Sequence, residues 1–158
     1  MAESDCDRVW KRAKDVGFCM LSTIDGDQID SRPMAAYVRP EEERIYFLTD
    51  KGSAKEEEIA RNANVNLAFA DAGDQTYVSI RGRASLSNDR DKIRDLWSPP
   101  AKAWWDGPDD PSIRLLTVEP TEAQYWDSPG TVASYIKMAA AFVSDARLAV
   151  GDHAKVDM

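Results

Sequence analysis

The sequence predicts a mainly β domain, an antiparallel barrel of six or seven strands with peripheral helices. Three observations support this fold: short strand-like segments recur along the 158 residues, short turns join most of them, and helical segments are inserted between some of them. This arrangement favours an antiparallel barrel over a parallel α/β sheet. The length and the 43% hydrophobic content suit one domain with a substantial core.

The strands follow from the apolar pattern and from the turns that interrupt it. Asp25-Gly26 is typical of a hairpin turn, because glycine tolerates a positive φ. Residues 40–43 read as an exposed turn, and Gly73-Asp74 turns the chain again. The predicted strands are residues 18–24, 28–39, 44–49, 65–70, 77–86, 113–119 and 123–127.

Residues 77–86 form the clearest strand, because apolar and polar side chains alternate along it. Gly82 interrupts the apolar face, which predicts a bulge or a close approach of another backbone. One face carries Val78, Ile80, Ala84 and Leu86, and the other carries Tyr77, Ser79, Arg81, Arg83 and Ser85.

Helices are predicted where the apolar period changes from two to about 3.6 residues. The first begins at Ser4, which forms a cap with Asp7, and ends near Gly17. The second begins at Ser53, where Glu56 three residues on completes a capping box, and ends near Asn62. Two further helices are expected at residues 89–97 and in the alanine-rich stretch 132–149.

The composition disfavours several classes of function. A net charge of −8 repels phosphate backbones and anionic lipid, so no nucleic-acid or membrane partner is expected. The acidic start lacks a signal-peptide layout, and we expect a cytoplasmic protein. One histidine and two cysteines, Cys6 and Cys19, offer no metal site and no histidine-based triad; both thiols are expected free, with Cys19 in the core.

A possible phosphate cradle lies at the start of the second helix. Lys51, Ser53 and Lys55 place two cations and a hydroxyl beside free backbone N–H groups, and Gly52 lets the backbone come close. The alternative is a solvated turn with an ordinary N-cap. The acidic runs 41–43 and 56–58 are interpreted as solvated faces without chemistry.

An arginine and several aromatic residues are further candidates. Arg32 lies on a strand of small and apolar residues and is suited to bidentate phosphate binding; the alternative is a surface arginine paired with a nearby acid. Trp104 and Trp105 border a Gly/Pro/Asp loop and, with Trp97 and Trp126, could cover a planar ligand, although core or dimer packing explains most such rings.

Taken together, these segments resemble the pyridoxamine 5'-phosphate oxidase-like FMN-binding split barrels, in the general stress protein branch. The resemblance runs from about Val9 to Asp127, and the order and spacing of its pieces make it specific. The matching pieces are residues 31–34, 46–49, 52–55, 65–69, 78–82, 103–105, 107–111 and 125–127.

The resemblance implies a split β-barrel at residues 1–127, and the alanine-rich pattern beyond it predicts a helical tail at residues 128–158. The resemblance also implies a homodimer with FMN at the interface, or FAD as the alternative flavin. The residues implied at the site are Arg32, Ser53 and Lys55 for the phosphate, Pro33, Met34, Leu48 and Thr49 along the isoalloxazine, and Tyr77, Trp105 and Trp126 as contacts from either subunit.

The resemblance favours a flavin-dependent oxidoreductase linked to stress response, with no catalytic residue identified. NAD(P)H or a small molecule is the expected redox partner. A non-catalytic flavin carrier or sensor is the alternative, and a structural dimer without cofactor is a weaker one. No Arg-x-His element follows Tyr125-Trp126-Asp127, and this makes pyridoxamine phosphate oxidation doubtful.

Overall fold

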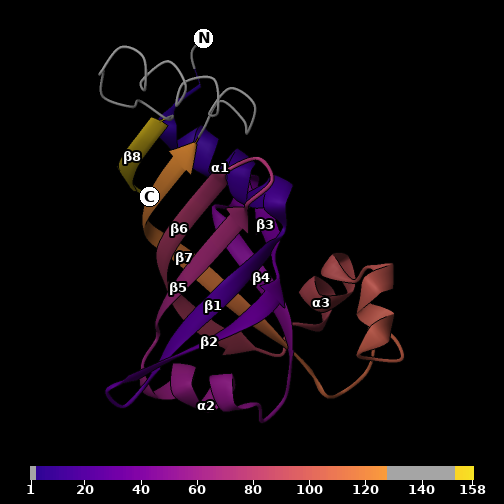
Figure 1. The fold of residues 1–158 in the computed structure, drawn as a ribbon. Helices are drawn as coiled ribbons and strands as arrows, with labels where there is room; N and C mark the ends of the chain where they lie inside the picture. The colour runs from indigo at the N-terminus through magenta and orange to yellow at the C-terminus, as the bar shows by residue number, and fades with distance from the viewer. Residues whose placement is uncertain (1–2, 128–151) are drawn as a thin grey trace, which may run out of the picture.

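The computed structural model describes residues 3–127 and 152–158, which form an antiparallel sheet of eight strands with three α-helices (Figure 1). The helices are α1 (Asp5–Val16), α2 (Ala54–Arg61) and α3 (Arg90–Leu96), with 3₁₀ turns η1 (Pro40–Glu42) and η2 (Pro99–Ala103). The strands are β1 (Phe18–Asp25), β2 (Gln28–Ala35), β3 (Tyr37–Arg39), β4 (Arg44–Asp50), β5 (Asn64–Asp71), β6 (Thr76–Ser87), β7 (Ile113–Asp127) and β8 (Asp152–Asp157). The predicted mainly β fold with flanking helices is confirmed.

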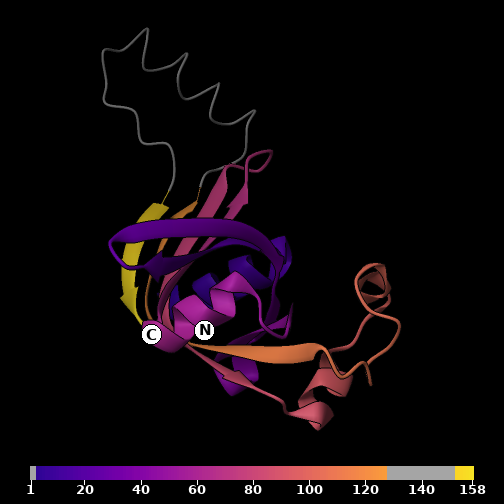
Figure 2. The ribbon, with the colours of Figure 1, turned by 90° about the horizontal axis from the view of Figure 1, so that it is seen from below.

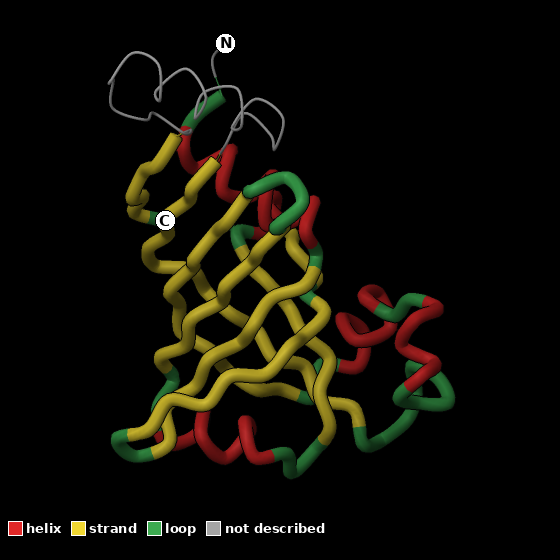
Figure 3. The backbone as a smooth tube through the Cα atoms, viewed as in Figure 1, coloured by secondary structure: helices red, strands yellow, loops and turns green. Residues whose placement is uncertain are grey.

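The sheet curls into a barrel that does not close by hydrogen bonds. Its strand order is β2-β1-β5-β6-β7-β4-β3, with β8 paired to β7, so β2 and β3 are the two ends of the path. Helix α2 lies across one end of the barrel and α1 lies at the other, while the strands form the wall (Figures 1 and 3). The barrel is therefore split between β2 and the β3–β4 pair.

Alternate side chains of the strands fill the interior, and α1 seals it. Val9, Trp10 and Ala13 of α1 are buried in the main core. The predicted cap is confirmed: Ser4 Oγ accepts a hydrogen bond from the Asp7 N–H at 3.0 Å, and Gly17 ends the helix at φ 75°. Cys19 is buried as predicted, and burial raises the pKa of its thiol to about 12.

Residues 88–112, between β6 and β7, form an arm that stands away from the barrel (Figures 1 and 2). Arg90 attaches the arm to the sheet, because its guanidinium donates to the carbonyl oxygens of Ile113, Pro108 and Asp110. A second apolar cluster beneath the arm contains Tyr46, Leu48, Ile93, Leu96, Ile113 and Leu115, with Tyr37, Trp97 and Trp105 packed against it.

Gly82 produces both features that the sequence predicts there. The register of β6 against β7 shifts between Arg81 and Gly82, and a Cβ on Gly82 would lie 2.7 Å from Glu119 O. The bulge also corrects one prediction, because the two strands expected at residues 113–119 and 123–127 are the single strand β7, which continues past the extra residue Thr121.

The C-terminus corrects another prediction. Residues 152–157, expected to belong to a helical tail, are strand β8. Strand β4 pairs with Ile113–Val118 of β7, which leaves the backbone N–H and C=O groups farther along that edge of β7 without partners from β4. Strand β8 pairs with residues 122–127 of this edge. The helix expected at residues 132–149 lies outside the described residues. Within the described part of the chain, no helix has the length and apolarity needed to cross a membrane.

Candidate functional site

Arg32 is held at the α2 end of the barrel by groups from β1 and α2. It lies opposite Leu21 on the β1–β2 ladder. Its Nη1 donates to Thr23 Oγ1 at 2.7 Å and to Leu21 O at 3.4 Å, and its Nη2 donates to Glu58 Oε2 at 3.0 Å. The pairing of Arg32 with a nearby acid, the alternative considered from the sequence, is therefore present.

Lys55 lies beside this arginine. Its side chain is half-buried, and burial lowers the pKa of its ammonium; the positive charge of Arg32 lowers the same pKa further. Among the described residues, Lys55 forms no ion pair within 4.0 Å, whereas Arg32 has Glu58. The fold thus places two cations within electrostatic range, as the sequence predicts.

The N-terminus of α2 lies in the same corner. Ser53 occupies the N-cap, but its hydroxyl makes no capping bond and lies 3.5 Å from Thr49 Oγ1. Glu56 accepts a hydrogen bond from the Gly52 N–H at 2.8 Å, so the predicted capping box with Ser53 is wrong. The backbone N–H groups of Ala54 and Lys55, in the first turn of α2, have no hydrogen-bond acceptor among the described residues.

Glu58 corrects the interpretation of residues 56–58 as a solvated face. Its side chain is only 8% exposed and accepts hydrogen bonds from Thr23 Oγ1 and Arg32. The hydrogen bond from Thr23 lowers the pKa of Glu58. Helical spacing could have indicated this burial from the sequence. Glu58 and Ile59 lie three and four residues after Lys55, so all three share one side of α2, the side that faces the barrel.

Two more carboxyl groups surround Glu58. Asp30 lies opposite Thr23 on the β1–β2 ladder, and a hydrogen bond with Glu58 raises its pKa. One carboxylate oxygen each of Asp25, Asp30 and Glu58 lies within 4.8 Å of the others, and Arg61 lies 3.7 Å from Asp25. We call Arg32, Lys55, Glu58, Asp30 and the start of α2 the charged corner.

The residues expected along the flavin ring lie on the two sides of the split. Pro33 and Met34 are on β2, an end of the sheet path, and Leu48 and Thr49 are on β4. Strand β3 pairs with Arg44–Tyr46 of β4, and among residues 3–127 and 152–158 no strand pairs with the later half of β4 from that side. Unpaired backbone edges of β2 and β4 therefore border the split near the charged corner.

The three expected aromatic contacts do not come together in one chain. Trp105 packs against the cluster of Leu48, and its Nε1 donates to Asp50 Oδ1 at 2.7 Å, so it lies near the end of β4. Tyr77 pairs with Ala70 and with Trp126. Ala70 lies three residues along β5 from Leu67, which shares a cross-strand row with Leu21 and Arg32. The pair therefore lies about 10 Å from Arg32 along the strands, and three or four strands across the sheet from it.

The Tyr77 end of the sheet carries an exposed apolar row on its outer face. Tyr77 and Trp126 are each 40% exposed, and the Trp126 ring stacks on His153 with centroids 4.9 Å apart. Phe18 is 64% and Met20 42% exposed on the same face. A monomer in water gains nothing from exposing such a row, so it suits contact with another surface.

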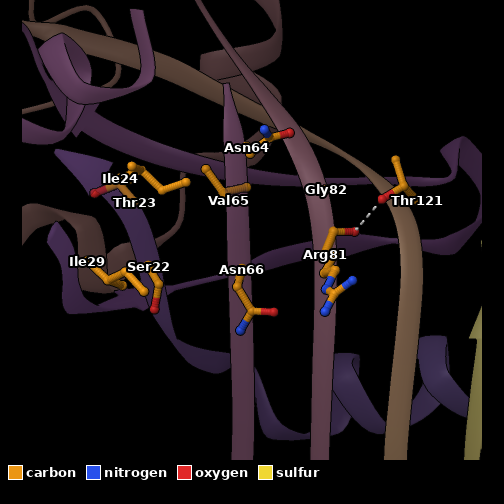
Figure 4. Close-up of a pocket in the computed structure, with 10 residues that line it drawn as sticks. All are labelled: Ser22, Thr23, Ile24, Ile29, Asn64, Val65, Asn66, Arg81, Gly82 and Thr121. Atoms are coloured by element: carbon orange, nitrogen blue, oxygen red, sulfur yellow. Dashed lines mark hydrogen bonds between the residues drawn. The ribbon is translucent and has the colours of Figure 1, made fainter. Parts of the chain in front are cut away.

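A groove of about 620 Å³ lies on the outer face between this row and α2. Figure 4 shows Ser22, Asn66 and Arg81 side by side on β1, β5 and β6, and the register pairs them in a cross-strand row. The groove is lined by Ser22, Thr23, Ile24, Ile29, Asn64, Val65, Asn66, Arg81, Gly82 and Thr121. Among these lining residues, Thr23 accepts a hydrogen bond from Arg32, which connects the groove to the charged corner.

A sequence model of the pyridoxamine 5'-phosphate oxidase like family matches residues 4–148. General stress protein 26 of Bacillus subtilis is 35% identical over 85 residues, which cover 49% of this chain and 58% of that protein. Protein bli-3 of Neurospora crassa is 28% identical over 90 residues, which cover 51% of this chain and 43% of that protein. The chain thus matches about half of the length of these curated relatives.

Solved structures agree with the fold. A Jannaschia sp. CCS1 protein assigned as general stress protein 26 superposes with a TM-score of 0.77 at 27% identity, covering 95% of this chain and 96% of that chain. The general stress FMN/FAD binding protein of Xanthomonas citri gives a TM-score of 0.68 at 29% identity, covering 78% and 89%. The chain belongs to the pyridoxamine 5'-phosphate oxidase-like family, among proteins similar to general stress protein 26.

Proposed function

We propose that the chain is a cytoplasmic stress-related protein that binds FMN, with the flavin phosphate in the charged corner and the ring along the split. The observation that carries the proposal is the closeness of two cations, Arg32 and Lys55, at a helix N-terminus with free amide groups. The positive charge of Arg32 lowers the pKa of Lys55 although Glu58 pairs with Arg32, and a further anion bound beside both cations would relieve this repulsion. The Xanthomonas citri relative, described as FMN/FAD binding, supports the choice of flavin.

The residues present fit a phosphate in this corner. Arg32 has five N–H donors, of which three are used by Leu21, Thr23 and Glu58, so two remain for an anion. Lys55 forms no ion pair among the described residues, and the Ser53 hydroxyl makes no capping bond. A phosphate would collect charge-assisted hydrogen bonds from these groups, each contributing about 1.5–3 kcal/mol.

The backbone of Pro33-Met34 and Leu48-Thr49 would bind the polar edge of the ring across the split. A bound flavin supplies the transfer of one or two electrons, while the protein supplies orientation and hydrogen bonds. We propose an oxidoreductase that uses NAD(P)H or a small molecule, because electron transfer through a flavin requires no catalytic acid or base from the chain. A flavin carrier or sensor is the second candidate.

A homodimer is part of the proposal. The exposed row of Phe18, Met20, Tyr77 and Trp126 provides the apolar surface that a second copy would cover. Tyr77 and Trp126 lie three and four strands across the sheet from Arg32 of their own chain, and we propose that they contact the flavin of the partner subunit.

The test is a fluorescence titration of the purified protein with FMN and with riboflavin, which lacks the phosphate. The proposal expects FMN to bind at least about 100-fold more tightly, since a phosphate bound by Arg32 and Lys55 contributes two charge-assisted contacts. Equal affinities, or no binding of either flavin, would contradict it. Steady-state NAD(P)H oxidation by the FMN-loaded protein then separates an oxidoreductase from a carrier.

A further inference from the structure

Glu58 is a buried carboxylate beside the cation that we assign to the phosphate. At 8% exposure it could be expected to cancel the charge of Arg32 and to repel an anion. Its hydrogen bonds show a different arrangement. Thr23 donates its hydroxyl hydrogen to Glu58 Oε2 and accepts a hydrogen bond from Arg32 Nη1, so the three side chains form a closed ring of contacts with the Glu58–Arg32 pair.

This ring fixes the guanidinium in one place. Arg32 is anchored at Nη1 by Thr23 and Leu21 and at Nη2 by Glu58, which are contributed by β1 and by α2. Lys55 is one helical turn before Glu58 on the same side of α2. Glu58 therefore ties the position of Arg32 to the same helix that carries Lys55 and the free amide groups.

We infer that Glu58 is a positioning residue: it holds Arg32 in place while two N–H donors of the guanidinium remain available for the phosphate of the flavin. This inference rests on the proposed function. A long arginine side chain that is free in solution must be immobilised when the ligand binds, and each such side chain weakens binding by a factor of about 2–10. In this chain Glu58 and Thr23 remove that loss before the ligand arrives.

Positioning and simple charge cancellation predict opposite effects for Glu58→Met, which removes the acceptor but keeps the volume of the side chain. If Glu58 only repels the phosphate, its removal strengthens FMN binding. If Glu58 positions Arg32, its removal weakens FMN binding roughly three- to tenfold and leaves riboflavin binding unchanged. Glu58→Gln keeps an oxygen that accepts from Thr23 and Arg32, so this variant restores at least the wild-type preference for FMN.

The experiment measures the ratio of FMN to riboflavin affinity in the wild type, Glu58→Met, Glu58→Gln and Arg32→Ala. The ratio cancels any loss of folded protein, because both flavins require the same fold. Glu57→Met is the matched control, since Glu57 is the exposed neighbour on the same helix and carries the same charge. Thr23→Val, which removes the hydroxyl at nearly constant volume, is the second variant and should also lower the ratio.

The outcomes separate the two proposals. A wild-type protein without a preference for FMN overturns the proposed function and, with it, this inference. The second outcome is that the wild type prefers FMN and Arg32→Ala reduces this preference, but Glu58→Met leaves it unchanged or increases it. This result overturns the positioning role of Glu58 and leaves the proposed function standing. A fall in Glu58→Met that Glu57→Met reproduces also overturns the positioning role, because the effect is then a general one of charge on α2.

Discussion

The two ends of the barrel differ in how far their candidate site residues contact one another within one chain. At the α2 end, Arg32, Glu58 and Thr23 are bonded to one another, and Lys55 lies beside them. At the other end, Tyr77 and Trp126 stay 40% exposed, with His153 stacked on the tryptophan. The charged groups are thus organised by contacts within one chain, whereas the aromatic side chains at the other end remain exposed in that chain.

The largest effect should come from breaking the aromatic end. Phe18→Asp places a charge in the exposed apolar row, and burying that charge in an interface costs several kcal/mol. We expect light scattering after size-exclusion chromatography to show a dimer for the wild type and a monomer for the variant. Ser87→Asp, at the far end of β6, is the control that should remain a dimer. A wild-type monomer would contradict the assignment of this surface.

A substitution between the two ends should destabilise the chain without touching either surface. Gly82→Ala introduces a Cβ 2.7 Å from Glu119 O and from Val118 Cγ1, at the bulge between β6 and β7. Overpacking of this kind costs about 1–3 kcal/mol in the free energy of unfolding. Urea denaturation measures the loss, and Gly107→Ala, where a Cβ meets nothing within 4 Å, is the control.

The smallest effect should appear in the pH dependence at the α2 end. Burial and Arg32 lower the pKa of Lys55. If Lys55 binds the flavin phosphate as proposed, the phosphate raises this pKa again, and FMN binding favours the protonated amine. The FMN-to-riboflavin affinity ratio should fall as pH rises through the lowered pKa of free Lys55. The slope is at most about tenfold per pH unit, because one proton is involved.

Lys55→Arg keeps a positive charge throughout this range and should remove the decline. A decline of the same size in Lys55→Arg would assign the pH dependence to another group. Riboflavin, titrated in parallel, accounts for any change in the ring or in the fold.

The barrel was predictable from the sequence because its signals are local. The turn at Gly26, the cap at Ser4 and the bulge at Gly82 depend on neighbouring residues or on missing side-chain volume, and the structure has all three. Strand β8 was not predictable, because it forms where β7 extends beyond β4, and that difference in length is a property of the assembled sheet.

In the charged corner, the sequence pointed to the basic residues as candidates but not to the acidic ones. Arg32 and Lys55 stand out in an acidic chain, but Glu58 lies in a run of three glutamates that looks solvated. Helical spacing puts Glu58 on the same side of α2 as Ile59, but that this side is buried follows from the packing of Ile59 against the barrel. The ten residues expected at the flavin remain predictions, of which Arg32, Ser53 and Lys55 lie in one corner and Tyr77 and Trp126 lie at the opposite end.

The most direct test of the account is the FMN affinity of the double variant Arg32→Ala with Lys55→Ala, measured beside its riboflavin affinity. We expect FMN binding to weaken by about 10²–10⁴-fold, since two charge-assisted contacts are lost, and riboflavin binding to stay within about twofold. Lys11→Ala with Lys14→Ala removes the same charge at exposed positions of α1, at the other end of the barrel, and should change neither affinity much. An unchanged FMN affinity in the Arg32/Lys55 variant would contradict the central claim.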